Sequence, residues 1–111
     1  MRTETLITNF ELVVLLALIR LGDDAYGIPI SSEIELRCGR EPSMASIYAA
    51  LARLEGKGFV SSRMGEPTPE RGGRAKRYFR ISPRGLREVR EVKGDLIKMW
   101  SGLTDLKEER A

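Results

Sequence analysis

The sequence contains no histidine and only one cysteine, Cys38. Without histidine, catalysis by a Ser–His or Cys–His pair is excluded, and so is a zinc site made of His and Cys ligands. A lone cysteine argues against a disulfide-stapled secreted domain, so we expect a cytoplasmic protein. We expect no enzymatic activity, no metal and no cofactor, and a purely structural role for Cys38.

Long apolar runs are also absent. The longest, residues 12–19, has eight residues, whereas a membrane-spanning helix needs about twenty. It follows Glu11 instead of a basic stretch, and no small-residue cleavage site comes after it, so it is not typical of a signal peptide. We therefore expect a buried helix there, within a chain of 111 residues that forms one core.

Positive charge is concentrated in the middle of the chain. Residues 1–36 carry two basic and six acidic side chains, and residues 91–111 carry four and five. Residues 37–90 carry thirteen basic and five acidic side chains. A basic patch of this kind attracts a polyanion, most often a nucleic acid.

Two helices are predicted in the first third of the chain. The first runs from about Asn9 to Leu21 behind a cap at Thr8 or Asn9, and it is apolar nearly all round, so it should be central in the core. The second begins near Tyr26 or Gly27, because Pro29 is tolerated only in a first turn, and it ends at Gly39. Three residues should form its inner face: Ile30, Ile34 and Leu36.

A third helix is predicted directly after Ser43, which would be its N-cap. Ile47, Leu51 and Leu54 follow at helical spacing and form one buried stripe. The opposite face carries small and hydroxyl-bearing side chains, which favours the close approach of a partner. Its members are Ala45, Ser46, Tyr48, Ala49, Ala52 and Arg53.

A hairpin with a long tip is predicted after the third helix. Residues 59–64 and 75–81 have the pattern of two strands, and the glycines and prolines between them indicate a loop. Because an isolated hairpin is marginally stable, it must pack on the helices through Val60, Phe79 and Ile81. The loop is strongly basic, and its contacts to phosphate would come from Arg71, Arg74, Lys76 and Arg77, with Gly72 and Gly73 allowing close approach of the backbone.

The last predicted helix begins at Ser82-Pro83 and extends to about residue 107. Apolar residues recur along it every three or four positions, and no segment of the chain remains to cover them all. We therefore expect this helix to pair with its copy in a second subunit. The predicted interface residues are Leu86, Val89, Val92, Leu96, Trp100, Leu103 and Leu106.

Together these elements predict a mostly α fold with a small β-hairpin, arranged as a winged helix-turn-helix. Residues 1–82 would form the DNA-binding domain, with the wing at about residues 65–75. Residues 83–107 would form the dimerisation helix, and residues 108–111 a tail. The outer face of the third helix would enter a major groove, with its N-terminal residues at the base edges.

Several blocks of the sequence resemble the PadR family of bacterial transcriptional regulators. The resemblance covers roughly residues 9 to 90 and is similar to the smaller members with a single C-terminal helix. The matching blocks are Ala25-Tyr26-Gly27, Ser46-Ile47-Tyr48, Leu51, Arg53-Leu54-Glu55, Gly58, Gly73-Arg74, Lys76, Tyr78, Ile81-Ser82 and Gly85.

The resemblance implies a homodimer that acts as a repressor on a near-palindromic operator in double-stranded DNA. It implies that Ser46 and Tyr48 contact DNA from the recognition helix. It also implies a hydrophobic or aromatic effector bound between the subunits, for which Leu96 and Trp100 are the candidate residues. The complete set predicted to bind DNA is Ser43, Ala45, Ser46, Tyr48, Ala49, Arg53, Arg71, Gly73, Arg74, Lys76 and Arg77.

Alternatives remain open for several residues. Tyr48 could pack against the domain edge, Arg53 could pair with Glu55 or Glu33, and Trp100 could be a packing anchor in the dimer and not a ligand contact. The wing could be an ordinary solvated loop. A winged helix can also serve as a protein-interaction adaptor without binding specific DNA. A phosphate-binding enzyme loop is disfavoured, because the glycines lie between two strands and not before a helix.

Overall fold

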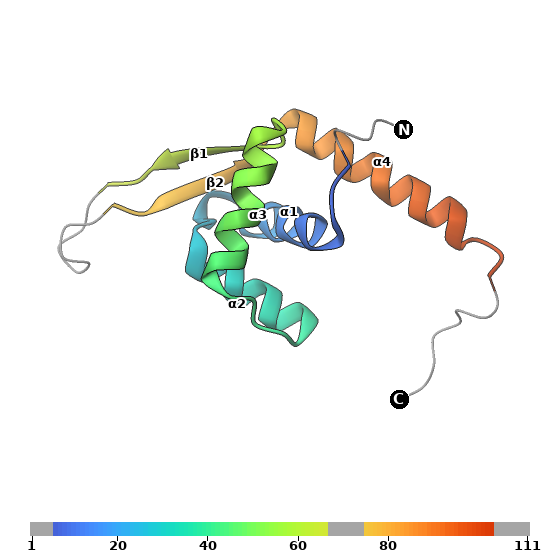
Figure 1. Ribbon diagram of the computed structural model, residues 1–111, viewed down its shortest axis with the longest axis horizontal. Coiled ribbons are helices and arrows are strands. Elements are labelled where there is room, and N and C mark those ends of the chain that lie inside the picture. Colours follow the sequence, from blue (N-terminus) through green and yellow to red (C-terminus); the bar gives the residue numbers. More distant parts are fainter. Residues whose placement is uncertain (1–5, 67–74, 104–111) are drawn as a thin grey trace.

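The structure is a computed structural model that describes residues 6–66 and 75–103. Figure 1 shows a body of three helices, α1 (Asn9–Leu21), α2 (Gly27–Cys38) and α3 (Met44–Gly56). The hairpin of β1 (Val60–Met64) and β2 (Arg77–Ile81) extends to one side of this body, and α4 (Pro83–Trp100) leads away on the other side. None of the helices in the described ranges is long and apolar enough to cross a membrane.

The predicted bounds of α1 are confirmed. Thr8 is its N-cap and forms a capping box with Glu11: the Thr8 side chain accepts from the Glu11 amide, and the Glu11 carboxylate accepts from the Thr8 amide. Gly22 ends the helix at φ 61°, a conformation that favours glycine. A short 3-10 turn, η2 (Gly22–Asp24), then leads to α2.

The core lies where α1, α2 and α3 meet, and the hairpin closes it. Ile30 and Ile34 point into it as predicted, but Leu36 is 74% exposed and the prediction for Leu36 is wrong. α1 is less completely covered than its apolar sequence indicated, because Leu16 and Ile19 remain exposed. The buried apolar residues are Val14, Leu15, Ala17, Leu18, Ala25, Ile30, Ile34, Ile47, Ala50, Leu51, Leu54, Phe59, Val60 and Phe79.

The hairpin is seated by one backbone bond and two buried side chains. The Phe79 amide donates to the Ala25 carbonyl at 2.8 Å, which joins β2 to the segment before α2. Val60 and Phe79 are buried in the core. Both strands are shorter than predicted: the Phe59 amide still bonds the Leu54 carbonyl of α3, and β2 begins only at Arg77.

α4 begins as predicted and ends earlier. Ser82 caps it by accepting from the Gly85 amide, and Pro83 occupies the first turn. The helix ends at Trp100, and Gly102 follows at φ 85°. Leu103 therefore lies beyond the helix, and Leu106 lies outside the described residues. The prediction that this helix extends to residue 107 is therefore wrong, because α4 ends at Trp100.

Two glycines of α4 provide a matched test of this packing. A Cβ on Gly85 would meet the Phe59 carbonyl and lie 2.8 Å from the Ile81 side chain, whereas a Cβ on Gly94 would have nothing within 4 Å. Gly85→Ala should lower the free energy of unfolding by about 1–3 kcal/mol. Gly94→Ala should raise it by up to about 1 kcal/mol, because alanine favours the helix. Urea unfolding of both variants measures this, and equal effects would contradict the packing described.

Candidate nucleic-acid interface

The outer face of α3 is exposed and thin. Ala45, Ala49 and Ala52 lie on it with Arg53, while Ile47 and Leu54 on the opposite face are buried. The exposed methyl groups leave the helix backbone accessible to a partner surface. A groove about 12 Å wide admits such a helix, which is the property expected of a recognition helix.

Two serine hydroxyls lie at the N-terminus of α3. The Ser43 side chain accepts from the Ser46 amide at 3.1 Å and caps the helix. The Ser46 hydroxyl donates to the Ser43 carbonyl at 2.8 Å and accepts from the Ser43 hydroxyl at 3.1 Å. Ser46 is half-buried, and its hydroxyl keeps one free acceptor lone pair. Donation to a base edge would require it to give up its bond to the Ser43 carbonyl.

Tyr48 combines packing with exposure. Its ring lies 6.2 Å from that of Phe79, and its hydroxyl lies so close to Gly27 that a side chain at Gly27 would collide with it. Tyr48 as a whole is nevertheless 44% exposed. The packing alternative is therefore observed, and the exposed part of the residue leaves the predicted contact to DNA open.

Arg53 pairs with neither Glu55 nor Glu33. Its Nε donates to Oε2 of Glu11 at 2.6 Å, across 42 positions of sequence. Lys57 Nζ donates to the other carboxylate oxygen of Glu11 at 2.9 Å. Glu11 itself is fully buried, at 0% exposure. No pattern in the sequence indicates this cluster, because the only local signal for Glu11 is its spacing from the cap residue Thr8.

Burial raises the pKa of Glu11, but its partners outweigh that effect. Hydrogen bonds from Arg53, from the Thr8 amide and from Lys57, together with the charge of Lys57, hold the pKa of Glu11 below its ordinary value. The carboxylate is thus ionised in the folded protein at neutral pH. It joins the beginning of α1 to the C-terminal half of α3.

The base of the wing carries alternating cations and aromatic rings. Lys76 Nζ lies 4.4 Å from the centre of the Tyr26 ring and donates to the Tyr26 hydroxyl at 3.3 Å. Tyr26 meets Tyr78 edge to face at 5.3 Å, and Arg63 lies over the Tyr78 ring at 4.7 Å. These contacts orient Lys76 at the beginning of α2.

Arg77 lies on the opposite face of the hairpin. Its guanidinium donates to Ser62 Oγ at 3.0 Å and to Glu55 Oε1 of α3 at 3.3 Å. A contact of Arg77 with DNA would therefore compete with Glu55. Three further predicted contacts, Arg71, Gly73 and Arg74, lie outside the described residues.

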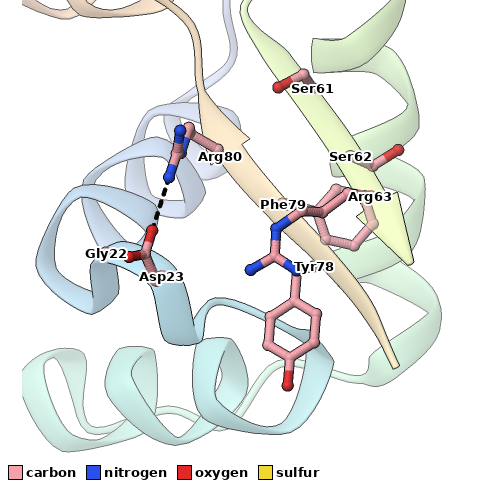
Figure 2. A pocket seen from close by; sticks show the side chains of 8 residues that line it. All are labelled: Gly22, Asp23, Ser61, Ser62, Arg63, Tyr78, Phe79 and Arg80. Atoms are coloured by element: carbon pink, nitrogen blue, oxygen red, sulfur yellow. Dashed lines mark hydrogen bonds and ion pairs between the residues drawn. The ribbon is translucent and has the colours of Figure 1, made fainter. Parts of the chain in front are cut away.

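Figure 2 shows a shallow hollow of about 130 Å³ between the hairpin and η2. Arg80 donates to Asp23 at 2.7 Å across it, and the Arg63 and Tyr78 side chains lie together at its other end. Both members of the Arg80–Asp23 pair are exposed, so the pair contributes little stability. None of the predicted site residues lines this hollow.

A second surface combines α1 and α4. A groove of about 330 Å³ brings the predicted effector residues Leu96 and Trp100 together with Leu12 and Leu16 of α1. Leu96 is 47% exposed and Trp100 is 56% exposed. The remaining lining residues are Val89, Lys93 and Ile97. Ile97 was not among the predicted interface residues, because it lies at the margin of the apolar stripe.

The described part of the chain contains no cluster of three or more His, Cys, Asp or Glu residues able to hold a metal ion. The fold is a winged helix-turn-helix: three helices are followed in the chain by a two-stranded hairpin and then by a fourth helix.

Comparison with known proteins gives the family. Residues 15–91 match the model of the transcriptional regulator PadR-like family. The chain belongs to this family. It is therefore a DNA-binding transcriptional regulator and not an enzyme, as the sequence predicted. No curated protein matches the chain significantly.

Solved structures agree with this assignment. A transcriptional regulator from Clostridium thermocellum is 26% identical, with a TM-score of 0.70 over 88% of this chain and 92% of that chain. A PadR family regulator from Eggerthella lenta is also 26% identical, with a TM-score of 0.68 over 88% and 83%. A PadR-like regulator from Bacillus cereus, at 19% identity, shares the fold with a TM-score of 0.70 over 91% and 93%.

The lowered pKa of Glu11 predicts how stability depends on pH. A carboxylate whose folded-state pKa lies below the ordinary value of 4.5 stabilises the protein above that pH, and the contribution is lost as the pH falls through the folded-state pKa. Glu11→Gln should therefore flatten the acid limb of the unfolding free energy, measured by urea unfolding between about pH 7 and pH 3. The exposed Glu35→Gln variant is the control and should retain the wild-type limb. Equal limbs for both variants would contradict the role of Glu11.

Proposed function

We propose that the protein is a repressor that binds a near-palindromic operator as a homodimer in the cytoplasm. The observation that carries the proposal is the thin, exposed face of α3 next to a basic hairpin. Recognition helices of a dimer would meet successive major grooves, roughly 34 Å apart for half-sites separated by one turn. The wings would then contact phosphates on either side.

The proposed dimer rests on the exposed apolar side chains of α4 and α1. Leu96, Ile97 and Trp100 are exposed on a helix that leads away from the body, and Leu16 and Ile19 are exposed on α1. Apolar surface on this scale is normally covered by a partner. A second copy of the chain, with α4 against α1 and α4, supplies a self-complementary surface.

The proposed effector is a flat, hydrophobic or aromatic molecule. The groove between α1 and α4 is apolar apart from Lys93, and Trp100 offers a ring on which such a molecule could stack. Binding there would alter the separation of the two recognition helices, and with it the affinity for the operator.

The proposed repressor is tested by titrating the protein against DNA from directly upstream of its own gene at two salt concentrations. Sequence-selective binding that weakens steeply with salt is expected. Lys76→Ala should weaken binding to all sequences alike and reduce the salt slope by about one unit. Lys98→Ala, which removes the same charge from the end of α4, is the control. An unchanged slope for Lys76→Ala would show that this lysine does not meet phosphate.

Sedimentation at micromolar concentration tests the dimer. Leu96→Glu should yield monomers, because a buried unpaired carboxylate in the interface costs several kcal/mol. Leu36→Glu makes the same change at an exposed position of α2 and should remain dimeric. A wild-type protein that sediments as a monomer would contradict the proposed dimer.

In the DNA titration, absence of binding to any DNA at low salt would favour a protein-interaction adaptor.

A further inference from the structure

Glu11 is the only fully buried acidic side chain among the described residues, and its contacts lead to the recognition helix. Its carboxylate accepts from Arg53 Nε, Lys57 Nζ and the Thr8 amide, at 2.6, 2.9 and 2.9 Å. Arg53 belongs to α3, and Lys57 is the C-cap residue of that helix. The orientation of the Arg53 side chain is therefore set by an acid at the beginning of α1.

Arg53 is only partly used by this contact. The side chain remains 50% exposed, and Nε is one of five N–H donors of a guanidinium. Arg53 also lies on the same helical face as Ala49 and Ser46, four and seven residues earlier. The remaining donors are thus available to an acceptor that approaches the outer face of α3.

The place of Arg53 along α3 decides which acceptor fits. Seven residues separate it from Ser46, which is about 10 Å along a helix axis. When the N-terminal residues of a recognition helix meet base edges, a residue two turns later lies over the flanking backbone. A phosphate oxygen is the acceptor expected there, and a guanidinium held in advance by a carboxylate loses less side-chain entropy on meeting it.

We infer that Glu11 is a positioning residue for DNA binding, which holds Arg53 ready for a backbone phosphate at the C-terminal half of α3. The inference rests on the proposed function. It assigns a role in recognition to a residue that is buried and cannot touch DNA.

The direction in which Glu11→Gln changes the affinity for DNA distinguishes positioning of Arg53 from a general charge effect. Glu11→Gln removes a negative charge, so a general charge effect would tighten the binding of DNA. In glutamine one of the two oxygens that accept from Arg53 and Lys57 is replaced by an amide nitrogen, which donates. Arg53 is then held at most by an uncharged, weaker acceptor, and its orientation is less fixed. Positioning therefore predicts weaker binding, on the order of fivefold.

The experiment measures the operator dissociation constant of Glu11→Gln and Glu35→Gln at one salt concentration, below the melting temperature of each variant. Glu35→Gln makes the same charge change on the exposed face of α2 and should bind as tightly as the wild type or more tightly. Glu11→Gln should bind more weakly than both. Binding by Glu11→Gln as tight as that of Glu35→Gln would overturn the inference.

A double-mutant cycle shows whether Glu11 acts through Arg53. Arg53→Gln should weaken binding and lower the salt slope by about one unit. Adding Glu11→Gln to that variant should cause no further loss of affinity. A further loss equal to that in the wild-type background would mean that Glu11 acts on the fold alone, and the inference would be wrong.

Arg53→Lys is a second variant that tests the inference if Glu11→Gln unfolds at the assay temperature. Lysine preserves the charge but lacks the Nε donor and the planar fork, so its affinity for DNA should fall. Unchanged affinity would overturn the inference. Wild-type protein that binds no DNA would overturn the proposed function as well, whereas wild-type binding with an unaffected Glu11→Gln variant would overturn the inference alone.

Discussion

The arrangement of this protein depends on one buried carboxylate. A charged group that leaves water is costly unless hydrogen-bond donors satisfy it. The Glu11 carboxylate accepts from the nearby Thr8 amide and from Arg53 and Lys57, which are 42 and 46 positions away in the sequence. The same oxygens complete the cap of α1 and hold Arg53 of α3 and Lys57, the C-cap residue of α3. The first and third helices are therefore fixed in register as well as packed. Apolar contacts alone would allow them to slide with less penalty.

Two other parts of the molecule are oriented by this helical body. The hairpin is attached through the Phe79–Ala25 backbone bond and through the contact of Lys76 with Tyr26, so the base of the wing keeps its place beside α2. α4 packs on the body through its first two turns, where Gly85 permits close contact with Phe59 and Val89 packs against the core. The rest of α4 leads into solvent with its apolar side chains exposed. The surface that would meet DNA and the surface that would meet a second subunit are thus separate, and α1 contacts both α3 and α4.

Much of the fold followed from local signals. The caps at Thr8, Ser43 and Ser82 and the glycines at 22 and 39 determine where helices begin and end, because they satisfy terminal backbone groups or permit a positive φ. Periodic apolar residues gave the inner face of α3 correctly. The errors arose where burial depends on a neighbour. Leu36 has the right character for a core residue but is exposed, and α4 ends at Trp100 although its apolar spacing continues.

The sequence by itself determined the class of protein: its helices, its hairpin, its basic middle third, and the absence of histidine. These properties depend on composition and on contacts within a few residues. Only the tertiary structure decided which charges meet. It paired Arg53 with Glu11, turned Arg77 toward Glu55 and brought Leu12 and Leu16 beside Trp100. Such contacts join residues that are distant in sequence, and no local pattern encodes them, because the partner of a charged side chain is set by how whole helices pack.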